Sequence, residues 1–531
     1  MTGDKLGNVL VNLGFITEER LINFLATQLK VPYLDLKTYP INVDVSKKFP
    51  ERLARRYRML LLEKKENSSL IGLVDPQDIF AIDEASRVLH TPISLALIKE
   101  KDCLATLDLI YRRTDEINKL ASELTDQISI SSIDIEQLSK DIGQEDIPVS
   151  KLLRSIFEDA VQVHASDIHI EPEEKLLRIR YRIDGVLQEH TVSETRVAPI
   201  LAQRIKILAH LNIMERRLPQ DGRFSLKIKN KNFDVRLSTM PIQYGESLVM
   251  RLLEQGVKIF SFDDLDVPDH YAQELKRILE IPSGMMLVTG PTGSGKTTTL
   301  FSLLNKLNSP EVKIITIEDP IEYQLPRLNQ IQVNPHIDLT FANVLRSSLR
   351  QDPDIIMVGE IRDAETLSIA LRAAMTGHLV LSTMHTHDTS SSVIRMLDLQ
   401  SETTLIASAL RLVLSQRLLR KLCPNCQIDY KPNIIQQKWL EKMSFSPDVI
   451  FGIGKGCPYC YGTGYRGRFA IFEMLVLDNE MISALQTHDL HAFNTLAKKA
   501  CTPLWRSAIQ AAIDRKTSLN EVVYLSTLQD K

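Results

Sequence analysis

The stretch that decides the fold is Gly290-Pro291-Thr292-Gly293-Ser294-Gly295-Lys296-Thr297. It is a complete G-x-x-x-x-G-K-[ST] phosphate-binding loop. An apolar strand, Met285 to Thr289, precedes it, and apolar residues at helical spacing follow it from Thr298 onward. Strand, loop and helix in this order are the context that the motif requires, because backbone N–H groups and the positive end of the helix then face the same phosphates. The stretch therefore predicts binding of a nucleoside triphosphate.

Two residues of this loop predict specific contacts. Lys296 can neutralise the β- and γ-phosphates, and the hydroxyl of Thr297 can be a ligand of Mg²⁺. The predicted nucleotide-binding set runs from Gly290 through Thr298. A chance match in a glycine-rich turn is the alternative, and the flanking strand and helix argue against it.

Short apolar strands alternate with helices on both sides of the loop, from about residue 281 onward. Besides Met285 to Thr289, the predicted strands are Lys313 to Ile317, Ile355 to Val358 and Leu379 to Ser382. Such alternation favours an α/β fold with a largely parallel sheet and helices on both faces.

Carboxylates follow two of these strands. Glu318 and Asp319 end one strand, and Glu360 follows another. The carboxyl ends of parallel strands share one edge of a sheet, so we expect these acids to gather around the loop. Glu360 is the candidate that polarises or deprotonates the attacking water, and Glu318 and Asp319 are candidates to hold Mg²⁺ or water. The alternative is that such acids cap the next helix, as Asp319 could.

Three histidines surround the last predicted strand. His378 precedes it, and His385 and His387 follow it. A metal site is disfavoured, because no further carboxylate or cysteine lies nearby at ligand spacing. We predict that His378 and His385 form hydrogen-bonding links between the nucleotide and a moving neighbour. Ordinary core or surface histidines are the alternative.

Four of the six cysteines form two C-x-x-C pairs, Cys423 with Cys426 and Cys457 with Cys460. This spacing is typical of a metal site, and four thiolates would fill a tetrahedral shell. The predicted ligand set therefore holds a structural Zn²⁺, with redox thiols or unrelated cysteines as alternatives.

Upstream of the loop, residues 148–256 read as an α+β segment with two hairpins. Alternating residues predict strands around the turn Asp184-Gly185, and again on either side of residues 230–231. In the second hairpin a period of two places Arg223 and Arg236 on the same face, away from the core. Arginines supplied from outside a nucleotide site can stabilise phosphate charge, although a solvated charged face is the alternative.

The N-terminal residues read as helical, and residues 121–147 as a polar linker. Apolar residues recur at helical spacing before and after Gly14, which predicts a small helical bundle. The whole chain has 531 residues and a formal net charge of 64 − 67 = −3, with neither a secretory signal nor an apolar run long enough to span a membrane. These features predict a large soluble protein of the cytoplasm and give no bulk argument for nucleic acid.

The order of these motifs resembles one family closely, over about residues 146–520. It is similar to the secretion-superfamily ATPases of type II secretion and type IV pilus assembly. The resemblance rests on the loop at Gly290, the stretches Ile317 to Glu322 and Val358 to Asp363, and the histidines. The preceding Gln220-Asp221-Gly222-Arg223 and the four cysteines resemble the assembly, or extension, branch.

The resemblance implies a domain order. A docking domain would occupy residues 1–120, a linker 121–147, and a PAS-like α+β domain 148–256. A RecA-like P-loop ATPase core would occupy 257–531, with the zinc-binding insertion at about 420–470. The family's arginine fingers come from the domain that precedes the core, at positions that match Arg223 and Arg236.

The resemblance also implies partners and a location. Members are cytoplasmic homohexamers, peripheral at the inner membrane, that use ATP and Mg²⁺ to turn a platform protein, which adds pilin or pseudopilin subunits. The N-terminal domain would bind a membrane-anchored docking protein. Lys5 to Leu36 resembles a repeat that binds cyclic di-GMP when it is present twice, and the single copy favours a helical bundle without that ligand. His387 stands where related chains commonly carry Asn.

Three other readings stay open at this stage. A retraction ATPase would be shorter and would lack the cysteines. A RecA-like motor that translocates nucleic acid would need a basic, aromatic channel, which the composition does not offer clearly. A regulatory nucleotide-binding protein without turnover is the third.

Overall fold

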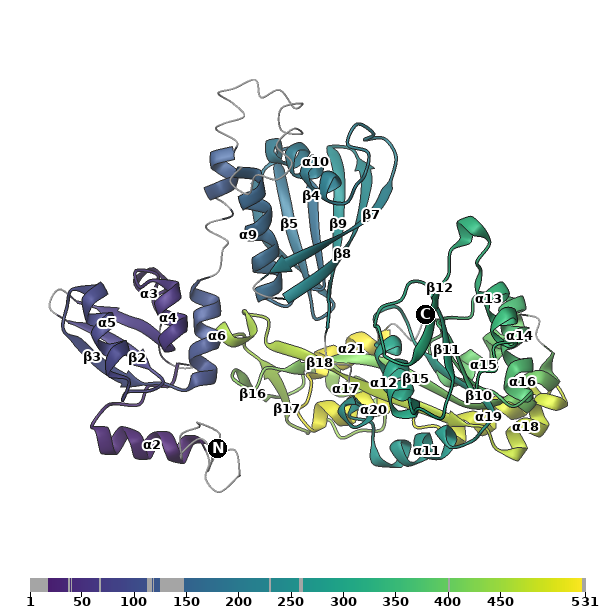
Figure 1. Ribbon diagram of the computed structural model, residues 1–531. Coiled ribbons are helices and arrows are strands. Elements are labelled where there is room, and N and C mark those ends of the chain that lie inside the picture. The colour runs from purple at the N-terminus through teal and green to yellow at the C-terminus, as the bar shows by residue number, and fades with distance from the viewer. Residues whose placement is uncertain are drawn as a thin grey trace. The chain divides into compact units, whose positions relative to one another are not determined.

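The protein is described by a computed structural model, in which two compact units are distinguished (Figure 1). Described residues are 18–527, apart from 37–38, 40, 66–67, 112–116, 118, 125–147, 229–230, 257–260 and 400–401. Unit 1 comprises Met1–Gly256, Cys423–Cys426 and Lys455–Gly464; unit 2 comprises Val257–Leu422, Gln427–Gly454 and Tyr465–Lys531. The predicted first helix, before Gly14, and nearly all of the predicted linker lie outside the described residues.

Unit 2 is built on a seven-stranded sheet with the order β12-β11-β13-β14-β10-β15-β18. Its strands are β10 (Gly284–Thr289), β11 (Ile314–Glu318), β12 (Leu328–Gln332), β13 (Ile355–Val358), β14 (Leu379–Met384), β15 (Leu410–Leu422) and β18 (Tyr465–Val476). Every neighbouring pair is parallel except β15 with β18, which is antiparallel. The predicted strands and the largely parallel sheet are confirmed.

Helices cover both faces of this sheet, and strand β10 shows why. Met285 and Leu287 belong to one apolar core with Leu367 and Leu371 of α14 (Ala364–Met375). Their neighbours Met286 and Val288 belong to a second core, which includes residues of α12 (Lys296–Leu307). Successive side chains of a strand point to opposite faces, so a strand with no polar alternation must be buried on both sides.

The remaining elements of unit 2 are further helices, 3₁₀ turns and the two strands of a separate small sheet. They are α11 (Asp269–Leu279), α13 (Phe341–Ser348), α15 (Thr389–Asp398), α16 (Thr403–Ala409), β16 (Gln427–Tyr430), α17 (Ile434–Lys442), β17 (Phe451–Gly454), α18 (Asn479–Gln486), α19 (Leu490–Ala500), α20 (Leu504–Ile513) and α21 (Leu519–Thr527), with 3₁₀ turns at Phe262–Leu265 and Pro335–Ile337.

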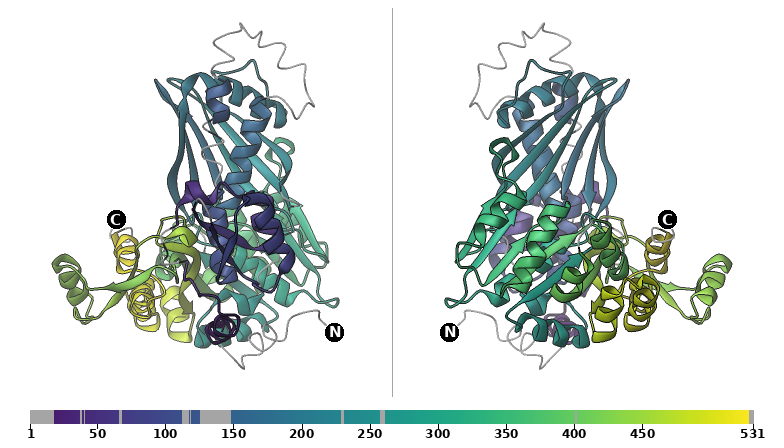
Figure 2. Two further views of the ribbon diagram at one scale, coloured as in Figure 1. Left: turned by 90° about the vertical axis from the view of Figure 1, so that its left-hand side faces the viewer. Right: turned by 90° about the vertical axis from the view of Figure 1, so that its right-hand side faces the viewer.

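Unit 1 contains a six-stranded antiparallel sheet with the order β6-β5-β4-β9-β8-β7. Its strands are β4 (Asp167–Pro172), β5 (Leu176–Ile183), β6 (Val186–Glu194), β7 (Gln220–Ile228), β8 (Lys231–Ile242) and β9 (Gly245–Glu254). Helices α9 (Pro148–Gln162) and α10 (Ala198–Leu208) share one apolar core with the strands and cover one face of the sheet (Figures 1 and 2). The hydroxyl of buried Tyr181 donates to the carbonyl of Ile156 at 3.0 Å. Both predicted hairpins are present.

The N-terminal part of unit 1 contains a sheet that the sequence analysis missed. Strands β1 (Met59–Lys64), β2 (Ser69–Leu73) and β3 (Ile93–Leu97) share one apolar core with helices α3 (Val43–Ser46), α4 (Glu51–Tyr57), α5 (Ile79–Leu89) and α6 (Glu100–Ile110), and helix α2 (Glu18–Leu29) precedes them in the chain. The regular elements of this domain are mostly helical, as predicted, and the three-stranded sheet is the part that was not predicted. Its strands are short apolar runs with little alternation, and such runs cannot be told from buried helix segments by periodicity alone.

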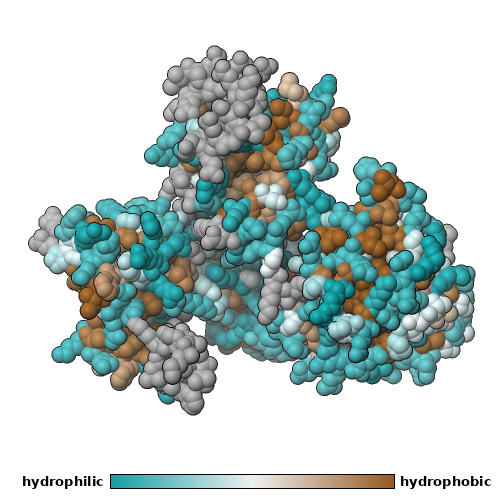
Figure 3. Space-filling view, viewed as in Figure 1, coloured by the Kyte–Doolittle hydropathy of each residue, from teal (hydrophilic) through white to brown (hydrophobic). Residues whose placement is uncertain are grey.

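Hydrophilic residues cover most of the face shown in Figure 3, and apolar residues form separate patches among them. None of the helices formed by the described residues combines the length and the apolar character that crossing a bilayer requires.

Candidate functional site

The phosphate-binding loop connects β10 to α12, as predicted. Gly290 and Gly295 have φ angles of +149° and +88°, which L side chains rarely adopt. Gln416 also leaves no space for a side chain at either position. A Cβ on Gly290 would lie 2.5 Å from the backbone oxygen of Gln416, and a Cβ on Gly295 would lie 2.8 Å from Nε2 of Gln416. The buried Oγ of Ser294 has no hydrogen-bond partner among the described residues. A buried polar atom without a partner in a loop of this kind fits a role in binding phosphate.

Lys296 begins α12 and bends back over the loop. Its Nζ donates to the carbonyls of Gly290, at 2.8 Å, and Pro291, at 3.0 Å. Burial lowers its pKa to about 8, Glu360 opposes this decrease, and Arg417 adds to it. The opposite contributions of Glu360 and Arg417 to this pKa mean that a carboxylate and a second cation both act on the ammonium group.

Glu360 lies at the carboxyl edge of the sheet, two residues after the end of β13, and its side chain is only 13% exposed. Its carboxylate forms an ion pair with Arg362 and lies 3.4 Å from Nε2 of His385. Burial lowers the pKa of His385, and Lys296 and Arg362 lower it further, whereas Glu360 raises it. Lys296, Glu360, Arg362 and His385 therefore form one mutually interacting group, of which Arg362 was not among the predicted residues.

Glu318 ends β11 at the same edge and is buried. Its Oε1 accepts hydrogen bonds from Thr316, at 2.6 Å, and Gln330, at 3.0 Å. Burial raises the pKa of its carboxyl group, and these hydrogen bonds oppose the increase. Asp319 next to it is exposed, and its charge contributes to raising the pKa of Arg362. Of the two predicted acids, Asp319 is thus the accessible one.

His378 lies at the other end of β14. Strands β10 and β14 are parallel, with Gly284 opposite Leu379, so the residue before β14 lies away from the edge that bears the loop. Its Nδ1 is 3.0 Å from the carbonyl oxygen of Ala373. Within one chain the structure does not bring His378 to the loop, whereas it does bring His385 there.

Two buried residues of β15 with polar partners near the loop were missed, Gln416 and Arg417. The hydroxyl of Thr299 on α12 donates to Oε1 of Gln416 at 2.7 Å. Arg417 donates through Nη2 to the carbonyl of His387 at 2.7 Å, and burial lowers its pKa. The signal was in the sequence: Ser415, Gln416 and Arg417 interrupt a strand of otherwise mostly apolar residues, next to β10.

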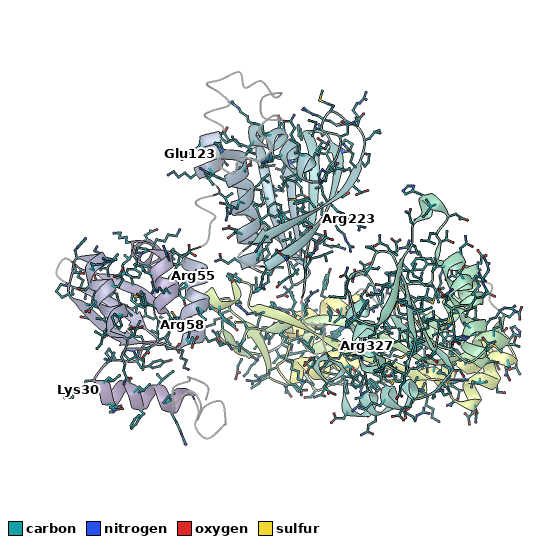
Figure 4. All side chains as sticks on the ribbon, in the orientation of Figure 1. Lys30, Arg55, Arg58, Glu123, Arg223 and Arg327 are labelled. Atoms are coloured by element: carbon teal, nitrogen blue, oxygen red, sulfur yellow. The ribbon has the colours of Figure 1, made fainter. Side chains whose placement is uncertain are left out.

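A row of charged residues crosses the exposed face of the six-stranded sheet in unit 1. Its members lie directly opposite one another on strands β7, β8, β9, β4 and β5: Arg223, Arg236, Arg251, Asp167 and Arg182. We call them the arginine row; Arg223 is labelled in Figure 4. The predicted placement of Arg223 and Arg236 on the same face of one hairpin is confirmed, and the register puts them directly opposite each other. Several of these side chains line a hollow of about 510 Å³.

The four cysteines gather within unit 1. Their Sγ atoms all lie within 4.8 Å of one another. Three of the separations are 3.7 Å between Cys423 and Cys457, 3.8 Å between Cys426 and Cys460, and 3.8 Å between Cys457 and Cys460. A tetrahedron with Zn–S distances of about 2.3 Å has edges of about 3.8 Å, so the donor set and its spacing fit zinc.

Hydrogen bonds around the sulfurs support the same conclusion. Backbone N–H groups of Cys457 and Gly464 each donate to Sγ of Cys460 at 3.2 Å. A hydrogen bond from Cys423 lowers the pKa of Cys460 to about 4, and the same bond, with burial, raises the pKa of Cys423. Four thiolates this close repel one another unless a cation binds between them.

Sequence comparison identifies the family. Residues 143–524 match the family described as "Type II/IV secretion system protein", and residues 29–117 match the MshEN domain. The type IV pilus assembly ATPase PilB of Myxococcus xanthus is 38% identical over 534 residues, which cover 98% of this chain and 93% of that protein. The type II secretion system ATPase E of Vibrio cholerae is 38% identical over 487 residues, covering 90% and 96%.

Among solved structures, the Legionella pneumophila ATPase DotB has the same fold. It superposes with a TM-score of 0.53 at 22% identity, covering 71% of this chain and 95% of that one. None of the relatives named here supports the nucleic-acid motor. The predicted family and the predicted ATPase activity are confirmed. The chain therefore belongs to the type II/IV secretion system protein family, and it is an ATPase.

Proposed function

We propose that this ATPase works as a homohexamer that hydrolyses ATP to drive the assembly of pilin or pseudopilin subunits through a platform protein of the inner membrane. The observation that carries the proposal is the group formed by Lys296, Glu360, Arg362 and His385 at the loop. It combines a phosphate-binding cation with a carboxylate that two other residues hold in place, as hydrolysis requires. The names of the relatives, PilB and the type II secretion ATPase E, support pilin or pseudopilin subunits as the proteins that are assembled.

Within this proposal, Lys296 and the loop from Gly290 to Thr298 bind the phosphates. Glu360 accepts a proton from the attacking water, and His385 orients that carboxylate. Thr297 and Asp319 would hold Mg²⁺, which neutralises phosphate charge when bound. Glu318 has a positioning role toward Thr316 and Gln330, because its buried carboxyl group already accepts hydrogen bonds from both side chains. His378 has a role only toward a neighbouring subunit.

Arg223 and Arg236 supply the charge that the loop itself lacks. We assign them to the phosphates of the nucleotide as arginine fingers, because both project from the exposed face of a sheet whose other face is covered by helices. ATP binding would bring the arginine row onto the phosphates, and product release would free it.

The same proposal gives the protein a place in the cell. It acts in the cytoplasm and associates peripherally with the inner membrane, where the N-terminal domain binds a membrane-anchored docking protein. That cyclic di-GMP does not bind this domain stays a prediction.

The arginine assignment is tested with Arg223→Ala and Arg236→Ala. Each should slow turnover by about 10³-fold, within the range of other arginine fingers, and leave the affinity for ATP within about threefold. Steady-state ATPase rates and titration calorimetry with a non-hydrolysable ATP analogue measure the two quantities. Arg178→Ala is the matched control, because Arg178 lies on the same sheet but pairs with Glu173 and Glu189. Equal losses of turnover and affinity would instead indicate a folding role.

The four cysteines hold a structural Zn²⁺ in this proposal. We expect one zinc per chain by metal analysis, and Cys457→Ser or chelation should remove it. Hydrogen exchange within residues 423–464 should then become at least about tenfold faster, because bound zinc contributes directly to local folding. Cys501→Ser is the control, since Cys501 lies outside the cluster. Protein that folds normally and contains no zinc would contradict the assignment.

A further inference from the structure

The arginine row has an arrangement of charge that folding alone does not favour. Arg223, Arg236 and Arg251 lie directly opposite one another on three neighbouring strands. Residues that face each other in this way have Cβ atoms only about 4.5–5.5 Å apart, and like charges at such positions are destabilising. With Arg182 and Asp167 the row contains four arginines and one carboxylate, a formal charge of 4 − 1 = +3.

Asp167 is the only carboxylate of the row, and three neighbouring side chains contact it. It is 5% exposed. Its Oδ1 accepts a hydrogen bond from Nε of Arg251 at 3.0 Å, and its Oδ2 accepts one from the hydroxyl of Ser166 at 2.8 Å. Nε of Arg182, on the neighbouring strand β5, lies 3.7 Å from the same Oδ2. The carboxylate is thus fixed from three directions and holds Arg251 by the nitrogen nearest its stem.

This grip leaves the outer part of the Arg251 guanidinium directed to the solvent. The side chain of Arg251 remains 55% exposed although its Nε is bound to a buried carboxylate. Arg251, Arg223 and Arg236 line the same hollow, with Asp221 as the other acid there. Fork-shaped guanidinium groups side by side suit an anion with several oxygens, such as the β- and γ-phosphates of a nucleotide.

We infer that Arg251, held in position by Asp167, is a third arginine that contacts the phosphates of the nucleotide, beside Arg223 and Arg236. The inference rests on the proposed function, in which this face meets the nucleotide, and it adds a contacting residue and a positioning residue. Arg251 supplies the third cation. Asp167 touches no phosphate; it limits the orientations that the guanidinium can adopt, so that the charge is already in place when the nucleotide arrives.

The test uses the full chain and four variants: Arg251→Ala, Arg251→Lys, Asp167→Asn and the double variant Asp167→Asn/Arg251→Ala. Arg251→Ala should lower kcat at least tenfold with KM within about twofold. Arg251→Lys should restore little, because an ammonium group lacks the planar fork. Asp167→Asn should lower kcat several-fold, and it should have no further effect when Arg251 is already alanine. This non-additivity distinguishes positioning from a general structural role.

Millimolar guanidinium ion provides an independent readout. It should partly restore turnover in Arg251→Ala and should not do so in Arg178→Ala, the control on the same sheet. Asp167→Asn could lower the midpoint of thermal unfolding. In that case the two Arg251 variants and the rescue by guanidinium decide the test, because substituting the exposed Arg251 side chain should leave the fold intact.

The outcomes separate this inference from the proposed function. Turnover at the wild-type rate in Arg251→Ala, together with slow turnover in Arg223→Ala and Arg236→Ala, would overturn the inference and leave the proposed function in place. Normal turnover in all three variants would overturn the inference together with the assignment of Arg223 and Arg236 as arginine fingers. Additive effects of Asp167→Asn and Arg251→Ala would overturn the positioning role of Asp167.

Discussion

The phosphate-binding loop of unit 2 and the arginine row of unit 1 handle charge in opposite ways. At the loop, cations alternate with acceptors: Lys296 binds two loop carbonyls, and Glu360 lies between Arg362 and His385. In the row, three arginines follow one another and Asp167 pairs at one end of that run. The charged groups at the loop thus have partners before a ligand binds, whereas the row carries an excess of positive charge.

This difference suggests a division of labour. A site whose groups are already hydrogen-bonded binds its ligand by exchanging existing partners, and it keeps its shape when empty. A row of like charges is stabilised most when a polyanion binds to it. The strength of its interaction with phosphate therefore depends strongly on how many arginines the row contains. Substitutions in the two regions should therefore affect binding, turnover and stability differently.

The largest effect is expected from Lys296→Ala. The variant loses the ammonium group that faces the phosphates, and charge-assisted hydrogen bonds contribute about 1.5–3 kcal/mol each. Affinity for ATP should fall by one to two orders of magnitude, and turnover by a factor on the order of 10³. Calorimetry and steady-state rates measure both, with Lys306→Ala, near the other end of α12, as the control. Full activity in Lys296→Ala would refute the assignment of the loop.

A smaller combined effect on binding and turnover, confined to turnover, is expected from Glu360→Gln. The amide keeps the shape of the side chain but cannot accept the proton of water, so turnover should fall by about 10²–10⁴ while ATP still binds. Glu365→Gln on α14 is the control, since that acid pairs with Arg346 on the surface. If Glu360→Gln retained more than a tenth of the wild-type rate, the base would have to be another residue.

The smallest effect, and the one most specific to the comparison, concerns stability without nucleotide. Arg223→Thr removes one of two directly opposed like charges, a gain of about 0.2–1 kcal/mol. The midpoint of thermal unfolding of unit 1 should rise by about 1–3 °C. Arg178→Thr should not raise it, because that arginine has carboxylate partners. A decrease in Arg223→Thr would show that the arginines of the row have favourable partners within the folded chain, as the charged groups at the loop do.

Much of the site was predictable because its signals are local. The loop, the strand that precedes it and the helix that follows are encoded by adjacent residues, and the period of two in one hairpin placed Arg223 and Arg236 on the same face. His378 shows the limit of such reasoning. Its distance from the loop depends on which end of β14 meets the carboxyl end of β10, and a list of strand-flanking residues does not contain that information.

The sequence by itself determined the nucleotide loop, the parallel core, the two C-x-x-C pairs and the family, since each depends on the spacing of residues along the chain. Only the tertiary structure decided that Arg362 and His385 flank Glu360, that Gln416 contacts the helix after the loop, and that Asp167 holds Arg251 from 84 positions away. Those partners are set by strand order and register, which arise from packing of the whole sheet and not from any short stretch of the chain.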